Sequence, residues 1–255
     1  MPNLEQIRTL RQTYFYNKGK FNHEKPNRIS RSYLDNLINY NSMSFNQKLQ
    51  VFNNIGTDTF DLDIIRYLEG QLKANVVLLF IDITDFSKKC ESMTNEQVVA
   101  YLDDYYDKVI PIIYQYGGEI DKIMGDGIIC IFGDPFLPLH MNKIENADKC
   151  SKEIITKLKP SSQAVKIALH EGEVIYYRNK SLTIPDYTIV GKMITDLFRL
   201  ESVADSNAIN YYEGLKYDNY SSNLKYIVSD WFFSSNIPTT LKGVSYTNRK
   251  YIQKK

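Results

Sequence analysis

The chain has 255 residues, a formal net charge of +1 and hydrophobic residues at 43% of its positions. This is the composition of a globular protein, and a charge so near zero excludes a global basic field that would collect nucleic acid. No apolar run reaches the ~20 residues that a membrane-spanning helix needs, and the first residues lack a secretory signal, so we expect a cytoplasmic protein without a membrane span.

Residues 1–73 differ in amino-acid composition from the rest of the chain. Asn, Tyr, Arg and Lys dominate the opening, and short stretches of helical spacing follow, such as Tyr33–Ile38. This pattern predicts an N-terminal helical extension over residues 1–73 that packs on a main domain over residues 74–255. Composition assigns the extension no chemistry of its own.

The first regular element of the main domain is a short apolar run, Val76–Ile81, which predicts a buried strand. Asp82 follows it directly. A carboxylate at the end of a hydrophobic strand is costly to leave ionised and unpaired. Thr84–Ser87 then form a short loop into a helix, whose free backbone N–H groups suit anionic phosphates.

A second acid lies in a predicted hairpin. Glu119–Ile123 and Ile128–Phe132 read as two strands around a turn rich in Gly and Asp, and Asp126 lies in that turn. If the hairpin neighbours the first strand, Asp82 and Asp126 converge. Two carboxylates at one spot repel each other, and a divalent cation between them removes that penalty. The pair therefore predicts a metal site suited to phosphate chemistry.

Other segments with clear periodicity complete the order. Helices are expected from a capped start at Thr94 to Gly117, over 142–158 and over 192–204. Strands are expected over 164–170, over 174–177 after a break at Glu171-Gly172, and near 246–252. The order β-α-β-β-α-β predicts an α+β fold, a ferredoxin-like palm with helices on a mostly antiparallel sheet.

Three motifs in this order resemble a known family. Phe80–Ser87, Lys122–Asp126 and Tyr187–Gly191, with Arg199 downstream, are similar to the class III nucleotidyl cyclase catalytic domain over about residues 75–250. The resemblance implies a homodimer with two composite active sites at its interface. It also implies a nucleoside triphosphate substrate, converted to a 3′,5′-cyclic nucleotide and pyrophosphate.

The same resemblance implies roles for individual residues. Asp82 and Asp126, helped by the carbonyl of Ile83, would hold two Mg²⁺ or Mn²⁺ ions per active site. The remaining positions would contact substrate: Thr84, Phe86 and Ser87 at the phosphate loop, Lys122 and Thr188 at the base, Arg199 at the α-phosphate and Lys242 at the terminal phosphates.

Two positions depart from the family pattern. Asp85 replaces a usual glycine in the small loop, and we expect it to point away from the triphosphate or to cap the helix. Thr195 replaces an asparagine that orients the ribose and phosphate, four residues before Arg199. Threonine can hydrogen-bond but has a shorter reach, so low activity or a shifted substrate is expected.

Simpler structural roles stay open for each residue. Asp82 and Asp126 could be strand-end caps, and Lys122 could form a solvated pair with its acidic neighbours. Arg199 could be a surface salt-bridge partner, and Thr188 an ordinary strand threonine.

Base choice is open as well. Lys122 favours a purine, as in adenylate and guanylate cyclases making cAMP or cGMP. Thr188, Thr195 and the lack of a recognisable sensor domain fit the stand-alone pyrimidine cyclases of bacterial antiphage signalling, which make cUMP or cCMP, and we favour these slightly. Another alternative is a catalytically weak nucleotide-binding module. A third alternative is a polymerase-like or cyclic-dinucleotide synthase palm, of which the synthase is disfavoured because the chain lacks an obvious Gly-Gly-Asp-Glu-Phe signature.

Overall fold

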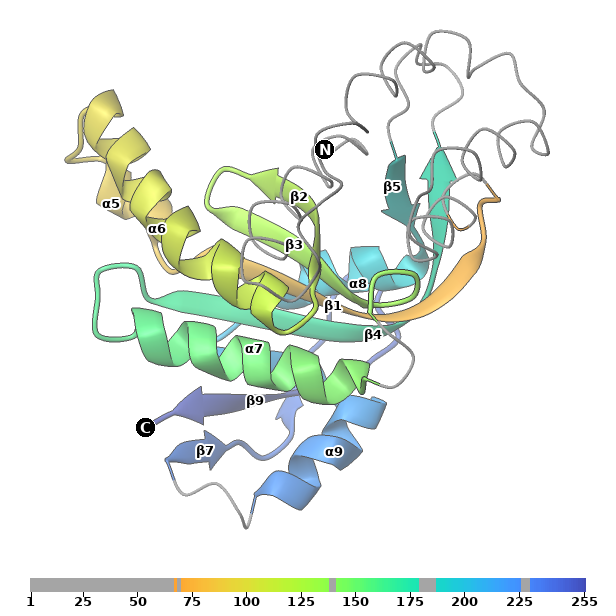
Figure 1. Ribbon diagram of the computed structural model, residues 1–255. Helices are drawn as coiled ribbons and strands as arrows, with labels where there is room; N and C mark the ends of the chain where they lie inside the picture. Colours follow the sequence, from red (N-terminus) through yellow and green to blue (C-terminus); the bar gives the residue numbers. More distant parts are fainter. Residues whose placement is uncertain (1–66, 68–69, 138–140, 179–186, 226–229) are drawn as a thin grey trace, which may run out of the picture.

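The computed structural model describes residue 67 and residues 70–137, 141–178, 187–225 and 230–255. The predicted N-terminal extension lies almost wholly outside these residues. The helices and strands follow in chain order (Figure 1): β1 (Lys73–Ile83), α5 (Phe86–Cys90), α6 (Asn95–Gln115), β2 (Glu119–Met124), β3 (Gly127–Gly133), α7 (Lys143–Leu158), β4 (Val165–Arg178), β5 (Tyr187–Val190), α8 (Lys192–Glu201), β6 (Ala208–Tyr212), α9 (Lys216–Leu224), β7 (Trp231–Phe233), β8 (Ile237–Pro238) and β9 (Asn248–Lys254).

One sheet organises the described residues. Its nine strands run in the order β2-β3-β1-β4-β6-β9-β7, with β5 beside β4 and β8 beside β9. Every pair is antiparallel except β4 with β6. The α+β prediction is confirmed.

Strand β1 lies inside the sheet between β3 and β4 and is covered on both faces. This explains why Val76–Ile81 is a continuous apolar run rather than an alternating one. Helices α6 and α7 lie in front of the sheet in Figure 1, and α8 lies behind it. Phe80 contacts Phe198 of α8, with ring centroids 5.1 Å apart. Because side chains alternate along a strand, Asp82 projects on the same side as Phe80, toward α8.

Local signals in the sequence set the element boundaries correctly at several points. Thr94 and Gln97 form a reciprocal capping box at the start of α6. Asn142 caps α7 by accepting hydrogen bonds from two backbone N–H groups. The predicted hairpin is β2–β3.

Three differences concern longer-range structure. The predicted break at Gly172 is absent, because β4 continues through it as one strand of 14 residues. Helix α8 ends at Glu201, three residues before the predicted end. Helix α9 was not predicted; its polar sequence is stabilised by tertiary contacts, such as the fully buried Tyr217.

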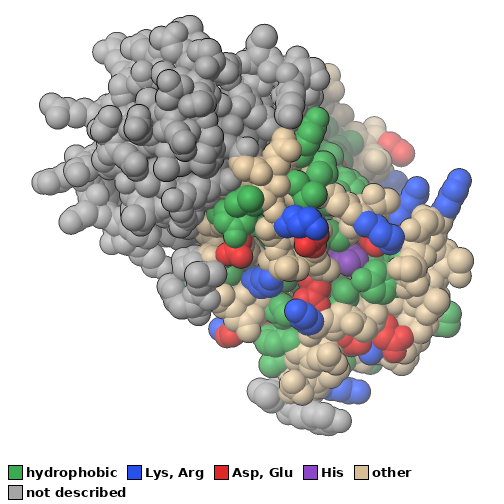
Figure 2. Space-filling view, turned by 90° about the vertical axis from the view of Figure 1, so that its right-hand side faces the viewer, with side chains coloured by type: hydrophobic (Ala, Val, Ile, Leu, Met, Phe, Trp, Pro, Cys, Tyr) green, Lys and Arg blue, Asp and Glu red, His purple; other side chains and the backbone are tan. Residues whose placement is uncertain are grey.

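No helix within the described ranges is long and apolar enough to cross a bilayer. Figure 2 shows basic, acidic and apolar side chains interspersed over the described part of one face. That face therefore carries no patch of a single charge.

Candidate active site

The two predicted acids meet at one end of β1. Strand β1 pairs with β3 so that Ile81 lies opposite Ile128, which places the β2–β3 turn and its Asp126 beside Asp82. The two carboxyl groups are close enough for the charge of Asp126 to act on Asp82. Burial, followed by the charge of Asp126, raises the pKa of Asp82 to about 6. The raised pKa indicates that nearby positive charge only partly compensates the negative charge of the two carboxylates.

Two residues that were not predicted complete this carboxylate cluster, which we define as Asp82, Asp126, Lys166 and Glu201. Lys166 lies opposite Asp82 on β4, and its Nζ is 3.3 Å from Asp82 Oδ2 and 2.6 Å from Glu201 Oε1. Burial opposes the charge on Lys166, but Glu201 and Asp82 outweigh it and raise the lysine pKa. A sequence signal that could have identified Lys166 is its position inside the apolar strand sequence Val165–His170.

The donor set of this cluster fits a hard divalent cation. Carboxylate and carbonyl oxygens are the ligands that Mg²⁺ and Mn²⁺ prefer. Within the described ranges, no three His, Cys, Asp or Glu side chains surround one point as a complete cation cage. Mg²⁺ usually takes only one or two carboxylates and completes its shell with water and substrate phosphates. Asp82 and Asp126, with the adjacent Ile83 carbonyl, match that pattern.

The loop after β1 has an unusual backbone at Asp85. Its φ of 55° lies in the left-handed region, which favours glycine, the residue that the family resemblance led us to expect here. The Asp85 side chain makes no capping hydrogen bond to α5. It lies at the surface and pairs with Lys88 at 3.3 Å. Of the two alternatives expected for Asp85, capping of the helix is wrong; the exposed side chain is directed instead to a surface lysine.

Phe86 and Ser87, the next two residues of the loop, differ in burial as an aromatic and a polar side chain are expected to. Phe86 is half-buried and packs against Tyr101, with ring centroids 6.2 Å apart, whereas Ser87 is exposed. The loop conformation is thus supported from inside by an aromatic contact. Its polar residue stays accessible to a ligand.

The two expected base-contacting residues also lie together. Lys122 on β2 is 3.3 Å from the Thr188 hydroxyl on β5 and 3.1 Å from the buried Asp121 carboxylate. The Lys122 side chain is only 16% exposed, which rules out the solvated pair. Burial raises the pKa of Asp121, and the nearby ammonium group opposes this.

Helix α8 presents its two candidate residues outward. Thr195 and Arg199 are both exposed, and within the described part of the chain the Arg199 guanidinium has no ion-pair partner. The alternative interpretation of Arg199 as a surface salt-bridge residue therefore has no support among the described residues. Lys242 is exposed in the segment between β8 and β9. The structure shows no contact between Lys242 and the carboxylate cluster.

Comparison with known proteins identifies the family. The adenylate and guanylate cyclase catalytic domain matches residues 68–218, more than half of the chain. The chain belongs to this family. The expected class III nucleotidyl cyclase fold and enzyme class are confirmed at the level of the family.

Individual relatives are distant. The terminal-differentiation-specific adenylate cyclase of Dictyostelium discoideum is 28% identical over 114 residues, which are 43% of this chain and 5% of that protein. The adenylyl cyclase CyaB from P. aeruginosa superposes with a TM-score of 0.58 at 22% identity, over 71% of this chain and 94% of that one. A dimeric guanylyl cyclase domain from Blastocladiella emersonii gives 0.57 at 18% identity, over 72% and 98%. The two structures establish the fold alone.

Proposed function

We propose that this cyclase-family chain converts a nucleoside triphosphate to a 3′,5′-cyclic nucleotide and pyrophosphate. In that reaction the ribose 3′-oxygen bonds to the α-phosphorus, the α–β anhydride bond breaks, pyrophosphate leaves and the hydroxyl proton passes to solvent. The observation that carries the proposal is the convergence of Asp82, at the end of β1, with Asp126, in the β2–β3 turn. Two under-compensated carboxylates suit a reaction that uses a cation and a polyanion together.

The proposed work of the protein is binding and positioning. Asp82 and Asp126 would hold two Mg²⁺ or Mn²⁺ ions, with the Ile83 carbonyl assisting. The chemistry that such ions supply is acidification of the ribose hydroxyl and neutralisation of phosphate charge. Thr84, Phe86 and Ser87 would form the loop beside the phosphates.

The other contacts would come from α8 and the chain's C-terminal region. The exposed Arg199 would stabilise charge on the α-phosphate with its planar guanidinium, and Thr195 would orient the ribose. Lys242 would contact the terminal phosphates.

A homodimer with composite sites accounts for the exposed groups on the base-contacting strands. Ile123 and Met124 follow Lys122 on β2, and their exposed fractions are 36% and 42%. Val190, close to Thr188 on β5, is 39% exposed. Apolar side chains at the surface beside functional residues are typical of an interface. A second copy would cover them and would bring its Arg199 to the carboxylates.

We propose a pyrimidine nucleotide as the substrate, with UTP favoured over CTP. Lys122 can only donate hydrogen bonds, and the Thr188 hydroxyl accepts one from it. A donor-rich site of this kind favours an acceptor at position 4 of a pyrimidine, where uracil presents a carbonyl oxygen and cytosine an amino group. Guanine presents a carbonyl oxygen at position 6, where adenine has an amino group, so guanylate cyclase activity is the nearest alternative, followed by adenylate cyclase activity. A role in bacterial antiphage signalling depends on the pyrimidine choice.

The direct test is incubation of the full chain with ATP, GTP, CTP and UTP separately, with Mn²⁺, and chromatographic separation of the products. We expect one preferred cyclic nucleotide with matching pyrophosphate release. If none of the four nucleotides yields a cyclic product, the proposal is contradicted.

The second candidate function is nucleotide binding without turnover. The observation behind it is the short Thr195 side chain where the family uses asparagine. This candidate predicts Mn²⁺-dependent nucleotide binding without pyrophosphate release, and the variant T195N would then gain activity. If wild-type protein turns over and T195N is no faster, the binding-module alternative fails.

A further inference from the structure

The turn between α8 and β6 reaches the strand end that carries Asp82. Thr84 Oγ1 and Ser206 Oγ lie 2.8 Å apart, so one hydroxyl donates a hydrogen bond to the other across 122 positions of sequence. Both residues are half-buried. Ser206 belongs to none of the sequence motifs described above, and it touches the phosphate loop at its first residue.

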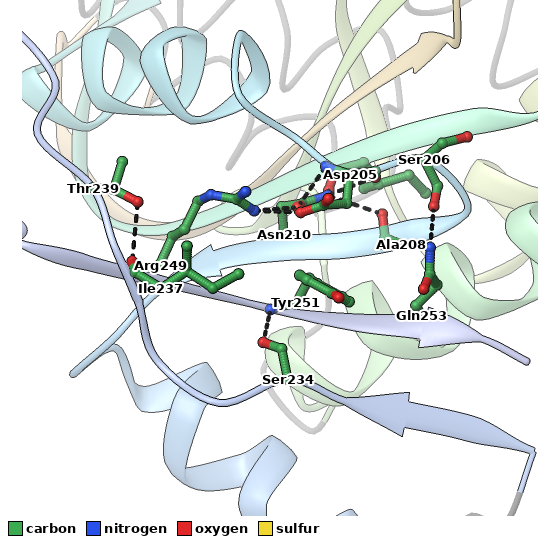
Figure 3. A network of polar contacts seen from close by, with 11 residues as sticks. Asp205, Ser206, Ala208, Asn210, Ser234, Ile237, Thr239, Arg249, Tyr251 and Gln253 are labelled. Carbon is green, nitrogen blue, oxygen red and sulfur yellow. Dashed lines mark hydrogen bonds and ion pairs between the residues drawn. The ribbon is translucent and has the colours of Figure 1, made fainter.

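Ser206 is held by a polar network drawn in Figure 3. Gln253 Nε2 of β9 donates to the Ser206 carbonyl at 2.9 Å, while the Ser206 hydroxyl lies at the opposite end of the residue. The neighbouring Asp205 donates its backbone N–H to Asn210 Oδ1 at 2.9 Å and pairs through its carboxylate with Arg249. Asn210 is completely buried. These contacts therefore hold the turn in a fixed position.

Thr84 is the last residue fixed before the backbone changes direction. Its N–H donates to the Ala164 carbonyl at 2.8 Å, which continues the β1–β4 ladder by one step. The next residue, Asp85, has the left-handed backbone described above. The hydroxyl contact with Ser206 thus adds a side-chain restraint where the ladder ends and the loop begins.

We propose that Ser206 is a positioning residue that holds the loop Thr84–Ser87, through Thr84, in the conformation that receives phosphates. The inference rests on the proposed function in so far as this loop binds a triphosphate. Restraining a loop before binding lowers the entropy lost on binding. The expected effect of removing one such hydrogen bond is therefore on phosphate affinity.

The test measures binding of inorganic tripolyphosphate with Mn²⁺ to the full chain by calorimetry. The variants S206A and T84V each remove one hydroxyl, and T84S retains it. We expect S206A and T84V to weaken binding about threefold to tenfold, the range that one net hydrogen bond spans, and T84S to restore it. The double variant T84V/S206A should bind no more weakly than the weaker single variant.

The matched control is S234A, because Ser234 Oγ accepts a 2.8 Å hydrogen bond from the Tyr251 N–H elsewhere in the same region. We expect S234A to bind like wild type, although its urea midpoint falls as that of S206A does. Equal binding by S206A and wild type overturns the inference and leaves the proposed function intact. Equal weakening by S206A and S234A also overturns it, because the effect is then general loosening. Wild-type protein that binds no tripolyphosphate contradicts the phosphate site itself, and with it both proposals.

Discussion

A buried acid and a half-buried acid in this molecule, Asp148 and Asp82, have opposite surroundings. Asp148 on α7 is 2% exposed and accepts a 2.7 Å hydrogen bond from the Tyr217 hydroxyl, and Lys152 Nζ lies 2.8 Å from its other oxygen. Asp82 instead faces a second carboxylate, Asp126, and shares its lysine with Glu201.

The difference separates a structural acid from a functional one. In the α7–α9 cluster, defined as Asp148, Lys152 and Tyr217, each carboxylate oxygen has a partner, so burial favours one fixed arrangement. In the carboxylate cluster the negative groups outnumber the single lysine. Leftover charge at a partly exposed position is what a cation and a polyphosphate could compensate. Substitutions in the two clusters should therefore have different effects.

The largest effect should come from removing a carboxylate of the pair. We expect D126A to lower turnover by on the order of 10³-fold, because the phosphates lose a cation-holding group while the fold persists. Steady-state pyrophosphate release measures this. D107A, which removes an exposed acid of α6, is the control and should keep wild-type turnover. Comparable activity of D126A and D107A would remove the carboxylate pair from the mechanism.

The α7–α9 cluster should respond in stability instead. Tyr217→Phe leaves an oxygen of the buried Asp148 without its donor, so we expect a loss of about 1–2 kcal/mol in the free energy of unfolding. Urea denaturation measures it, and Tyr177→Phe on the exposed β4 surface should change it by less than about 0.5 kcal/mol. Activity per folded molecule should stay constant in Tyr217→Phe. A large fall in that activity would erase the distinction between the clusters.

The raised pKa of Asp82 gives the comparison a pH dependence. Between its usual pKa of 3.8 and about 6, the folded protein holds the proton more tightly than the unfolded chain does. The metal-free protein therefore loses stability from this group as pH rises through that window. Asp82→Asn stays neutral, so its stability relative to wild type should rise by about 1 kcal/mol from pH 4.5 to pH 7, after allowance for solvent screening. A constant difference across the two pH values would show that Asp82 has no raised pKa.

The smallest effect should be at the base contact. Thr188→Val removes the hydroxyl that accepts from Lys122 and keeps a similar side-chain shape. We expect kcat/KM for the preferred nucleotide to fall about threefold, with a smaller preference over the other three nucleotides. Competition among the four triphosphates measures this. An unchanged preference would remove Thr188 from base recognition.

Structural features that depend on a few adjacent residues were predictable from the sequence, whereas contacts that depend on strand register were not. The run before Asp82, the turn around Asp126 and the Thr94 cap each depend on a few adjacent residues, and the structure contains all three elements. Lys166 and Ser206 contact the site only because β4 pairs with β1 in one register and the turn after α8 crosses to Thr84. No short pattern encodes such contacts.

The central claim is that Asp82 and Asp126 together hold divalent cations beside the phosphates of a nucleotide. Anomalous diffraction from crystals grown with Mn²⁺ and tripolyphosphate tests it most directly. The account predicts Mn²⁺ peaks between the two carboxylates and within reach of the phosphate oxygens. Peaks elsewhere in the molecule, or none at saturating Mn²⁺, would contradict it.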